Sequence, residues 1–421
     1  MRPGVTRLLN IGLRFTTLGT RFLFIFALAK YLDPASVGYY GIFTATVGYC
    51  LYFVGLDFYT YSTREILNKP IDQRGQLIKA QAALSGILYL VFFPIALIFL
   101  THVAWPDSLV LWFLPLLLLE HFNQELSRLL IALSEQLTAS MILFVRQGSW
   151  AIASVALMTF DPETRNLDFV MALWAAAGVC AGTIGLLKFK RLGVNGWGKR
   201  VDWRWIKKGV AVSSMFLIAT LALRGVQTLD RYWLEALNGI DMVAAYVLLL
   251  GVASTLLVFL DAGVFAFTYP SLIRHNNDKN YEIANDKVRR MLIQTLLVSA
   301  LFAVVSWFSL PWLLDWIGNP VYIEAIDLYP WLLVATIINA VSMVPHYGLY
   351  ARGCDKAIIY SHIASLIAFV AFTWIISQSA PEIAIPLGIN LAFFVIATWK
   401  SLAYIQVRKH DKSTVLLLNR T

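Results

Sequence analysis

Charged residues are scarce in this sequence. Only 14% of the 421 residues are Asp, Glu, Lys or Arg, whereas 59% are hydrophobic and the mean hydropathy is +0.67. A soluble domain has about 25% charged and about 45–50% apolar residues, so this apolar excess cannot fit inside a water-soluble core. Apolar runs long enough to cross about 30 Å of hydrocarbon as helices recur along the whole chain. The sequence therefore predicts an integral membrane protein.

Cysteine is also scarce, and the usual signatures of enzymes are missing. Cys50, Cys180 and Cys354 lie in or beside apolar runs, which predicts neither a disulfide framework nor a metal site. The sequence has no Walker loop and no nucleophile triad. We therefore expect a protein that is not an enzyme and has no cofactor or metal. The first apolar run has no small-residue cleavage site behind it, so we expect it to be retained as a membrane span.

Twelve apolar segments are long enough to be membrane spans. The predicted spans are 8–30, 38–61, 78–102, 108–133, 138–160, 167–188, 208–234, 242–268, 288–313, 325–350, 356–378 and 382–407. Five prolines fall inside them and predict irregular helices: Pro94, Pro115, Pro270, Pro345 and Pro386. Irregular helices suit a protein that changes conformation.

Lysine and arginine gather in alternate loops of this arrangement. If the N-terminus is cytoplasmic, the cytoplasmic side collects nearly all of the basic residues assigned to loops, Lys400 among them, and the opposite loops hold only Lys30, Arg165 and Arg231. Such an asymmetry follows the positive-inside rule and predicts that both termini are cytoplasmic. Because topology accounts for the net charge of +9, no nucleic-acid partner is expected.

The chain divides into two predicted halves of six spans each. Residues 1–190 form an N-terminal lobe, 191–207 a basic cytoplasmic linker and 208–421 a C-terminal lobe. The halves resemble each other weakly, since Lys30-Tyr31 corresponds to Arg231-Tyr232 and Tyr40 to Tyr246. Because six is even, such repeats would be parallel and related by an axis along the membrane normal.

Several arginines interrupt the apolar spans. Arg14 and Arg21 are seven residues apart, hence on one helical stripe and about 10 Å apart along the axis. Arg224 and Arg231 repeat this spacing in span seven. Guanidinium groups stay charged and grip phosphate oxygens in a fork, which suits a diphosphate ligand. We expect Arg21 and Arg224, with Arg14 and Arg146, to bind it. The alternative is pairing with buried acids or extension to the membrane surface.

Acidic and imidazole groups also interrupt spans. The segment "LLLLEHFNQELSRLL" contains Glu120, His121 and Glu125, a combination suited to coupling with a proton or sodium gradient. An ion pair between Glu125 and Arg128 is the open alternative. Asp57 and Asp261 correspond between the halves and are further coupling or gating candidates, although each lies near a cytoplasmic arginine with which it could pair.

One segment resembles a known superfamily. The stretch "LAKYLDPASVGYYGIFTATVGYCLYFVGLDFYTYSTREI" contains Leu32-Asp33-Pro34, Gly38-Tyr39-Tyr40, Gly55-Leu56 and Arg64-Glu65, and the second half contains "LDRYWLEAL" and "YPSLIR". These motifs resemble the Wzx-like polysaccharide flippases of the multidrug/oligosaccharidyl-lipid/polysaccharide (MOP) superfamily. The usual glycine of the first motif is replaced here by Asp33.

This resemblance implies an all-α membrane protein whose twelve transmembrane helices form two six-helix lobes around a central cleft, as in MATE transporters. It implies a bacterial inner-membrane flippase that moves an undecaprenyl-diphosphate-linked oligosaccharide, such as an O-antigen repeat unit, to the outer leaflet by alternating access, often coupled to an ion gradient. The implied partners are this lipid-linked substrate, membrane lipids and, transiently, a polysaccharide polymerase and a chain-length regulator.

Two other functions remain open at this point. A MATE-type multidrug or cation antiporter would share the fold, but its cationic drugs would favour acidic rather than arginine-lined pockets. A membrane polysaccharide polymerase or ligase would need a large outer loop with catalytic residues, whereas the predicted outer loops are short.

Overall fold

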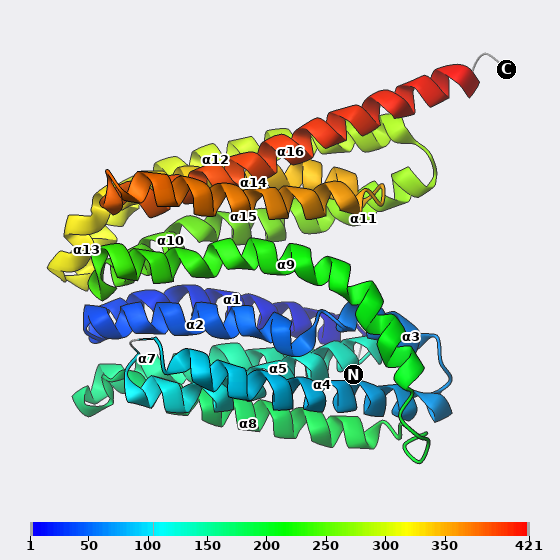
Figure 1. Ribbon diagram of the computed structural model, residues 1–421, viewed down its shortest axis with the longest axis horizontal. Coiled ribbons are helices and arrows are strands. Elements are labelled where there is room, and N and C mark those ends of the chain that lie inside the picture. The colour runs from blue at the N-terminus through cyan, green and yellow to red at the C-terminus, as the bar shows by residue number, and fades with distance from the viewer. Residues whose placement is uncertain (1–2, 104, 419–421) are drawn as a thin grey trace. The chain divides into compact units, whose positions relative to one another are not determined.

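A computed structural model describes residues 3–103 and 105–418, with side chains described for 8–103 and 105–409. Every regular element in these ranges is a helix (Figure 1). The chain divides into two compact units, residues 1–217 and 218–421, and the division falls within helix α9, Trp203–Asn238. Each unit has its own packed core.

The first unit is built from antiparallel and parallel long helices joined by short turns. Its elements before α9 are α1 Pro3–Tyr31, α2 Pro34–Gly55, α3 Tyr59–Leu67, α4 Ile71–Leu100, α5 Asp107–Ala132, α6 Gln136–Phe144, the π-helical segment η1 Val145–Ser149, α7 Trp150–Phe160, the 3₁₀ turn η2 Pro162–Thr164 and α8 Leu167–Arg191. Helix α5 contacts α2, α6 and α8, so its side chains lie at the centre of the unit.

The second unit follows the same plan. After α9 come α10 Ile240–Leu260, the π-helical segment η3 Asp261–Phe265, α11 Ala266–Asn277, α12 Tyr281–Ile317, α13 Pro320–Glu324, the 3₁₀ turn η4 Ala325–Leu328, α14 Tyr329–Tyr350, α15 Asp355–Ser377 and α16 Pro381–Leu418. Helices α14 and α15 both pack along α16 (Figure 1). A Cβ atom on Gly388 of α16 would collide with Thr373 Oγ1 of α15, so only glycine permits this close helix contact.

The predicted spans agree with the helices. Eleven helices in the described ranges are long and apolar enough to cross a membrane. Helix α5, which carries the polar run from Glu120 to Glu125, is not among these eleven, but it has 26 residues and lies where the fourth span was predicted. The all-α membrane-protein class predicted from the sequence is confirmed.

Some boundaries differ from the prediction for a local reason. The second span was expected to continue to residue 61, but α2 ends at Gly55 because Leu56 and Asp57 have positive φ angles of 50° and 49°. Left-handed backbone cannot continue an α-helix, so the chain breaks there and restarts as α3. The five prolines predicted inside spans do lie inside helices α4, α5, α11, α14 and α16.

The basic segment between α8 and α9 folds back onto α4. Gly75 donates its N–H to the carbonyl of Asn195 at 2.8 Å, and Lys79 Nζ donates to the carbonyls of Trp197 and Lys199. Trp205, in the first turn of α9, packs edge-on against Phe58 with ring centroids 5.2 Å apart. These contacts explain why the start of α9 belongs to the first unit.

Candidate functional site

Arg14 and Arg21 lie on one stripe of α1, as their spacing predicts. Arg14 Nε donates a hydrogen bond to Ser140 Oγ at 3.0 Å, and Arg21 Nη1 donates to Gln147 Oε1 at 3.1 Å. The two acceptors are also seven residues apart, so α1 runs parallel to the α6–η1 segment with a matching register. Both arginine side chains are exposed on the first unit.

The partners of these two arginines are neutral. Among the residues that the structure describes, no carboxylate lies within 4.0 Å of either guanidinium group. A cation inside a membrane span costs about 2.5–3.5 kcal/mol on insertion scales unless water or an anion accompanies it. Arg14 and Arg21 therefore present positive charge that the protein itself does not neutralise.

Arg146, predicted to act with them, is placed differently. It is only 6% exposed, and its Nη1 lies 3.6 Å from Glu120 Oε2 and donates to the Glu120 carbonyl at 3.1 Å. Trp174 Nε1 donates to Glu120 Oε1 at 2.9 Å, and Trp174 stacks on Trp150 with centroids 5.4 Å apart. Arg146, predicted to bind the diphosphate, and Glu120, predicted to act in coupling, thus belong to one closed, buried network.

His121 and Glu125 belong to two further networks, although both are on α5 with Glu120. His121 is 2% exposed, and its Nδ1 lies 2.5 Å from the Tyr89 hydroxyl of α4. Glu125 Oε1 lies 2.5 Å from Arg128 Nη1, and Gln81 Nε2 donates to its other oxygen at 2.6 Å. The ion pair considered as the alternative for Glu125 is the arrangement found. The three side chains do not form one coupling cluster.

The two corresponding aspartates have unlike surroundings. Asp57 is 6% exposed and has the left-handed backbone that separates α2 from α3. Asp261 is exposed and begins the π-helical segment η3, inside a helix that continues from α10 into α11. A break and a π-helical turn are both places where helices change direction or register, so each aspartate marks an irregular point of its unit.

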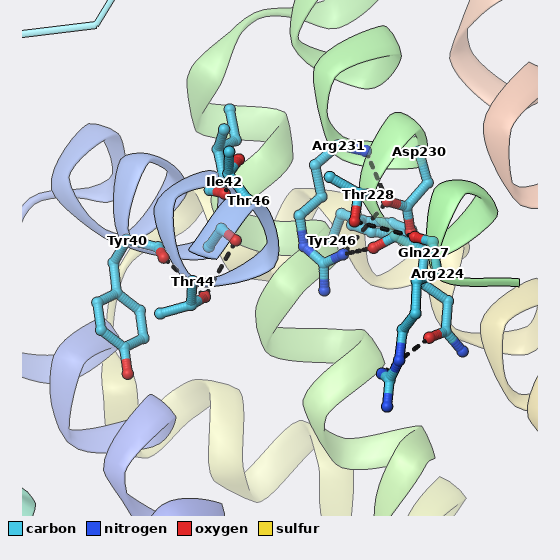
Figure 2. Close-up of polar contacts among 11 residues, drawn as sticks. Tyr40, Ile42, Thr44, Thr46, Arg224, Gln227, Thr228, Asp230, Arg231 and Tyr246 are labelled. Atoms are coloured by element: carbon cyan, nitrogen blue, oxygen red, sulfur yellow. Dashed lines mark hydrogen bonds and ion pairs between the residues drawn. The ribbon is translucent and has the colours of Figure 1, made fainter. Parts of the chain in front are cut away.

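Arg224 and Arg231, the second arginine pair, also differ from each other. Arg224 is exposed, and its Nη1 donates to Gln227 Oε1 at 3.1 Å (Figure 2). Arg231 Nη1 lies 3.2 Å from Asp230 Oδ1, and the Tyr246 hydroxyl donates to Asp230 Oδ2 at 2.5 Å. Arg224 thus resembles Arg21 in being exposed and bonded to a glutamine, whereas Arg231 is paired with a buried acid.

The sequence analysis missed one group of polar residues altogether. Lys400 was counted with the cytoplasmic residues and was not considered as a site residue, but it lies within the candidate span of α16 and is 2% exposed. The helices that pack along α16 carry His346 on α14 and His362 on α15. The signal was available, because Lys400 interrupts the apolar run "LAFFVIATWKSLAYIQV" within the predicted twelfth span.

Comparison with known proteins gives relatives by structure only. No protein-family model matches the chain, and no curated protein matches it in sequence.

Several solved structures match nearly the whole chain. An inward-facing multidrug resistance MATE family transporter of the MOP superfamily has a TM-score of 0.78 and 13% identity, covering 94% of this chain and 96% of that chain. A MATE transporter of Vibrio cholerae has a TM-score of 0.60 and 16% identity, covering 96% and 98%. A MOP superfamily transporter from Pyrococcus furiosus, described as having a binding pocket of reverse polarity, has a TM-score of 0.60 and 13% identity, covering 97% and 95%. The chain therefore has the fold of the MATE transporters of the MOP superfamily.

Proposed function

We propose that this protein is an alternating-access transporter that flips an undecaprenyl-diphosphate-linked oligosaccharide, the repeat unit of a surface polysaccharide, from the cytoplasmic to the outer leaflet of a bacterial inner membrane. One observation carries the proposal. Arg14 and Arg21 stand on one exposed stripe of a membrane helix, and their only hydrogen-bond partners in the described ranges are neutral side chains. Such a stripe needs an anionic ligand or water beside it.

A lipid diphosphate has the chemistry that this stripe requires. Its oxygens can accept forked hydrogen bonds from guanidinium groups, which stay protonated in any surroundings. Two arginines about 10 Å apart along the axis give the diphosphate two successive positions along the membrane normal. Their neutral partners, Ser140 and Gln147, hold the side chains in place without competing for their charge. In the second unit, Arg224 with Gln227 has the same chemistry.

Three acids of the predicted spans argue against the main alternative, a multidrug or cation antiporter. A cationic drug would need an acid that is open to it. Glu120, Glu125 and Asp230 instead lie against Arg146, Arg128 and Arg231, and of the predicted coupling acids Asp261 is the exposed one. The Pyrococcus furiosus transporter, described as having a pocket of reverse polarity and a different function, indicates that the fold is not limited to multidrug export.

Other parts of the functional assignment stay predictions. They comprise coupling or gating by Glu120, His121, Glu125, Asp57 and Asp261, the contribution of Arg146 to diphosphate binding, the cytoplasmic position of both termini, and the transient contact with a polymerase and a chain-length regulator. For Glu120 and Arg146, the closed network found here means that either role requires the pair to separate during transport.

The test is export of surface polysaccharide by a flippase-deficient strain that expresses the chain. Arg21→Ala and Arg14→Ala/Arg21→Ala are compared with Arg21→Lys at matched membrane amounts, and Arg191→Ala, an exposed arginine at the end of α8, is the control. Because a charged hydrogen bond contributes about 1.5–3 kcal/mol, we expect export to fall about tenfold or more in the alanine variants and to recover in part with lysine. Wild-type export by the double alanine variant would contradict the proposal.

A further inference from the structure

Lys400 is a buried cation in the middle of a membrane helix. It is 2% exposed and belongs to the largest fully buried side chains in the described ranges. It lies in the span Pro381–Lys409, 19 residues after the first residue of that span and nine before the last. At 1.5 Å per residue it lies about 28 Å from the start of α16, and the helix continues beyond it to Leu418.

Two histidines lie on the helices that pack along α16. His346 is two residues before Gly348, which packs against Tyr404 one turn beyond Lys400. His362 is on α15, whose Thr373 packs against Gly388 of α16. The Nδ1 atom of each histidine is buried and has no hydrogen-bond partner among the described residues. A buried polar atom without a partner costs about 1–3 kcal/mol, and each of these two ring nitrogens has an unused hydrogen-bonding position.

None of the described acids forms an ion pair with Lys400. In the described part of the chain, no carboxylate lies within 4.0 Å of Lys400. The described acids of α14, α15 and α16 are Asp355 and Glu382, in the first turns of α15 and α16. Glu382 is 18 residues from Lys400, or about 27 Å along the helix axis.

Helices α9, α14, α15 and α16 carry other charged and titratable groups, several of which have partners away from Lys400. Tyr404 donates to Asn285 Oδ1 and lies under Arg352, and Tyr347 and Tyr350 pack against Tyr269. Helix α9 approaches His362 at the Ala219 backbone, and its Asp230 is bonded to Arg231 and Tyr246. The remaining described groups on these elements are Arg204, Lys207, Lys208, Arg224, Tyr232, Glu235, Tyr329, Lys356, Tyr360, Arg408 and Lys409. The elements α10, α12 and η4 also pack against α14, and they carry Asp241, Tyr281, Glu282, Asp286, Lys287, Arg289, Arg290, Asp315 and Asp327.

Three bases without an acid form a site for a proton. Each positive charge added to the group repels the next, and burial penalises every charge, so the group holds one proton far better than two. Unlike arginine, lysine can give up its proton when it is buried. We propose that Lys400, His346 and His362 bind and release one proton during the transport cycle, which makes this cluster the proton-coupling site of the second unit. The ammonium of Lys400 becomes a neutral amine as its proton passes to a histidine ring nitrogen and from there to water. This inference rests on the proposed transport function, whose coupling ion it names.

A direct test counts protons and needs no substrate. Purified protein in detergent is moved from pH 8 to pH 6 in weak buffer, and proton uptake per chain is measured for wild type and for Lys400→Met/His346→Gln/His362→Gln. Lys409→Met, which removes an exposed lysine of the same helix, is the control. We expect wild type and control to take up about one proton more than the triple variant. Equal uptake by all three proteins would overturn the proposal. If the triple variant does not fold, the gradient experiment with the single variants Lys400→Met and His362→Gln decides.

A second test uses transport. Proteoliposomes are loaded with a fluorescent undecaprenyl-diphosphate oligosaccharide, with and without an imposed pH gradient. We expect the gradient to accelerate net flipping in wild type and in Lys409→Met, whereas Lys400→Met equilibrates the lipid without a response to the gradient. A response of Lys400→Met equal to that of wild type would overturn the coupling role. If wild type flips nothing but still shows the extra proton, the proposed substrate is wrong and the proton site stands.

Discussion

The two units differ in one buried cation. In the first unit, buried Arg146 and half-buried Arg128 each lie against a glutamate, and the arginines without an acid, Arg14 and Arg21, are exposed. In the second unit, Lys400 is buried among bases. A guanidinium group keeps its charge everywhere, so it must have either an acid or solvent, whereas an amine can lose its charge. The buried cations of the first unit are therefore fixed charges, whereas the second unit holds one charge that can change in addition to the fixed pair of Arg231 and Asp230.

The largest expected effect comes from breaking the fixed pair. Glu120→Ala leaves Arg146 buried without its acid, which destabilises a protein by about 3–5 kcal/mol. Thermal unfolding of the detergent-solubilised variant measures the loss. The double variant Glu120→Ala/Arg146→Met removes the stranded charge, and we expect it to recover most of the stability. Equal stability of Glu120→Ala and wild type would show that this pair is not a structural element.

Replacing Lys400 in the second unit is expected to raise stability rather than lower it. Since a buried charge without a partner costs about 2.5–3.5 kcal/mol in a membrane span, we expect Lys400→Met to raise stability by about 1–2 kcal/mol at pH 6, where the cluster holds its proton. The gain becomes smaller as the pH rises and the cluster loses that proton. The measurement is unfolding temperature against pH, with Lys409→Met as the control. A loss of stability at pH 6 would contradict this account.

A smaller effect is expected for Glu125→Gln. The amide keeps the shape of the side chain, and its one oxygen can still accept from Arg128, but its NH2 group cannot accept from Gln81, so the charge and one acceptor oxygen are lost. Because the Arg128 guanidinium also lies 3.5 Å from the centroid of the Tyr59 ring, it keeps a second stabilising contact. We expect a loss of about 1 kcal/mol in the free energy of unfolding. If Glu125→Gln lost as much stability as Glu120→Ala, the difference in burial between the Glu125–Arg128 and Glu120–Arg146 pairs would not determine their contributions to stability.

The smallest effect on stability is expected for Arg21→Ala. Its side chain is exposed and makes one hydrogen bond to a neutral group, so the change in stability should stay within about 0.5 kcal/mol. Flipping should nevertheless fall about tenfold, as for the loss of a charged hydrogen bond to substrate. Parallel unfolding and flipping assays check this separation. A large loss of stability in Arg21→Ala would instead show that Arg21 stabilises the fold.

The sequence predicted the fold more completely than the site. Apolar runs and charge asymmetry gave the twelve spans, because the membrane imposes length and polarity on each helix separately. The pair of Glu125 and Arg128 was foreseen as an alternative, since residues three apart on a helix are neighbours. The pair of Arg146 and Glu120 was not foreseen, because it joins two helices whose packing no single-helix pattern reveals.

Lys400 was missed for a different reason. The count of basic residues by loop included every lysine near the cytoplasmic end of a predicted span. Lys400 was therefore not recognised as a side chain that is buried in the second unit. The break after Gly55 was missed as well, since nothing in "FVGLDFYT" requires the positive φ angles of Leu56 and Asp57. Both errors occurred where tertiary packing decides the outcome.

The most direct test of the central claim is leaflet exchange by the purified protein. Proteoliposomes containing wild type or Arg14→Ala/Arg21→Ala are given a fluorescent undecaprenyl-diphosphate oligosaccharide, and the label reaching the opposite leaflet is followed by quenching. Our account predicts exchange by wild type and by Arg191→Ala, and a loss of about tenfold or more in the double variant. Equal exchange by all three proteins, or transport of a cationic dye by a wild type that leaves the lipid in place, would contradict it.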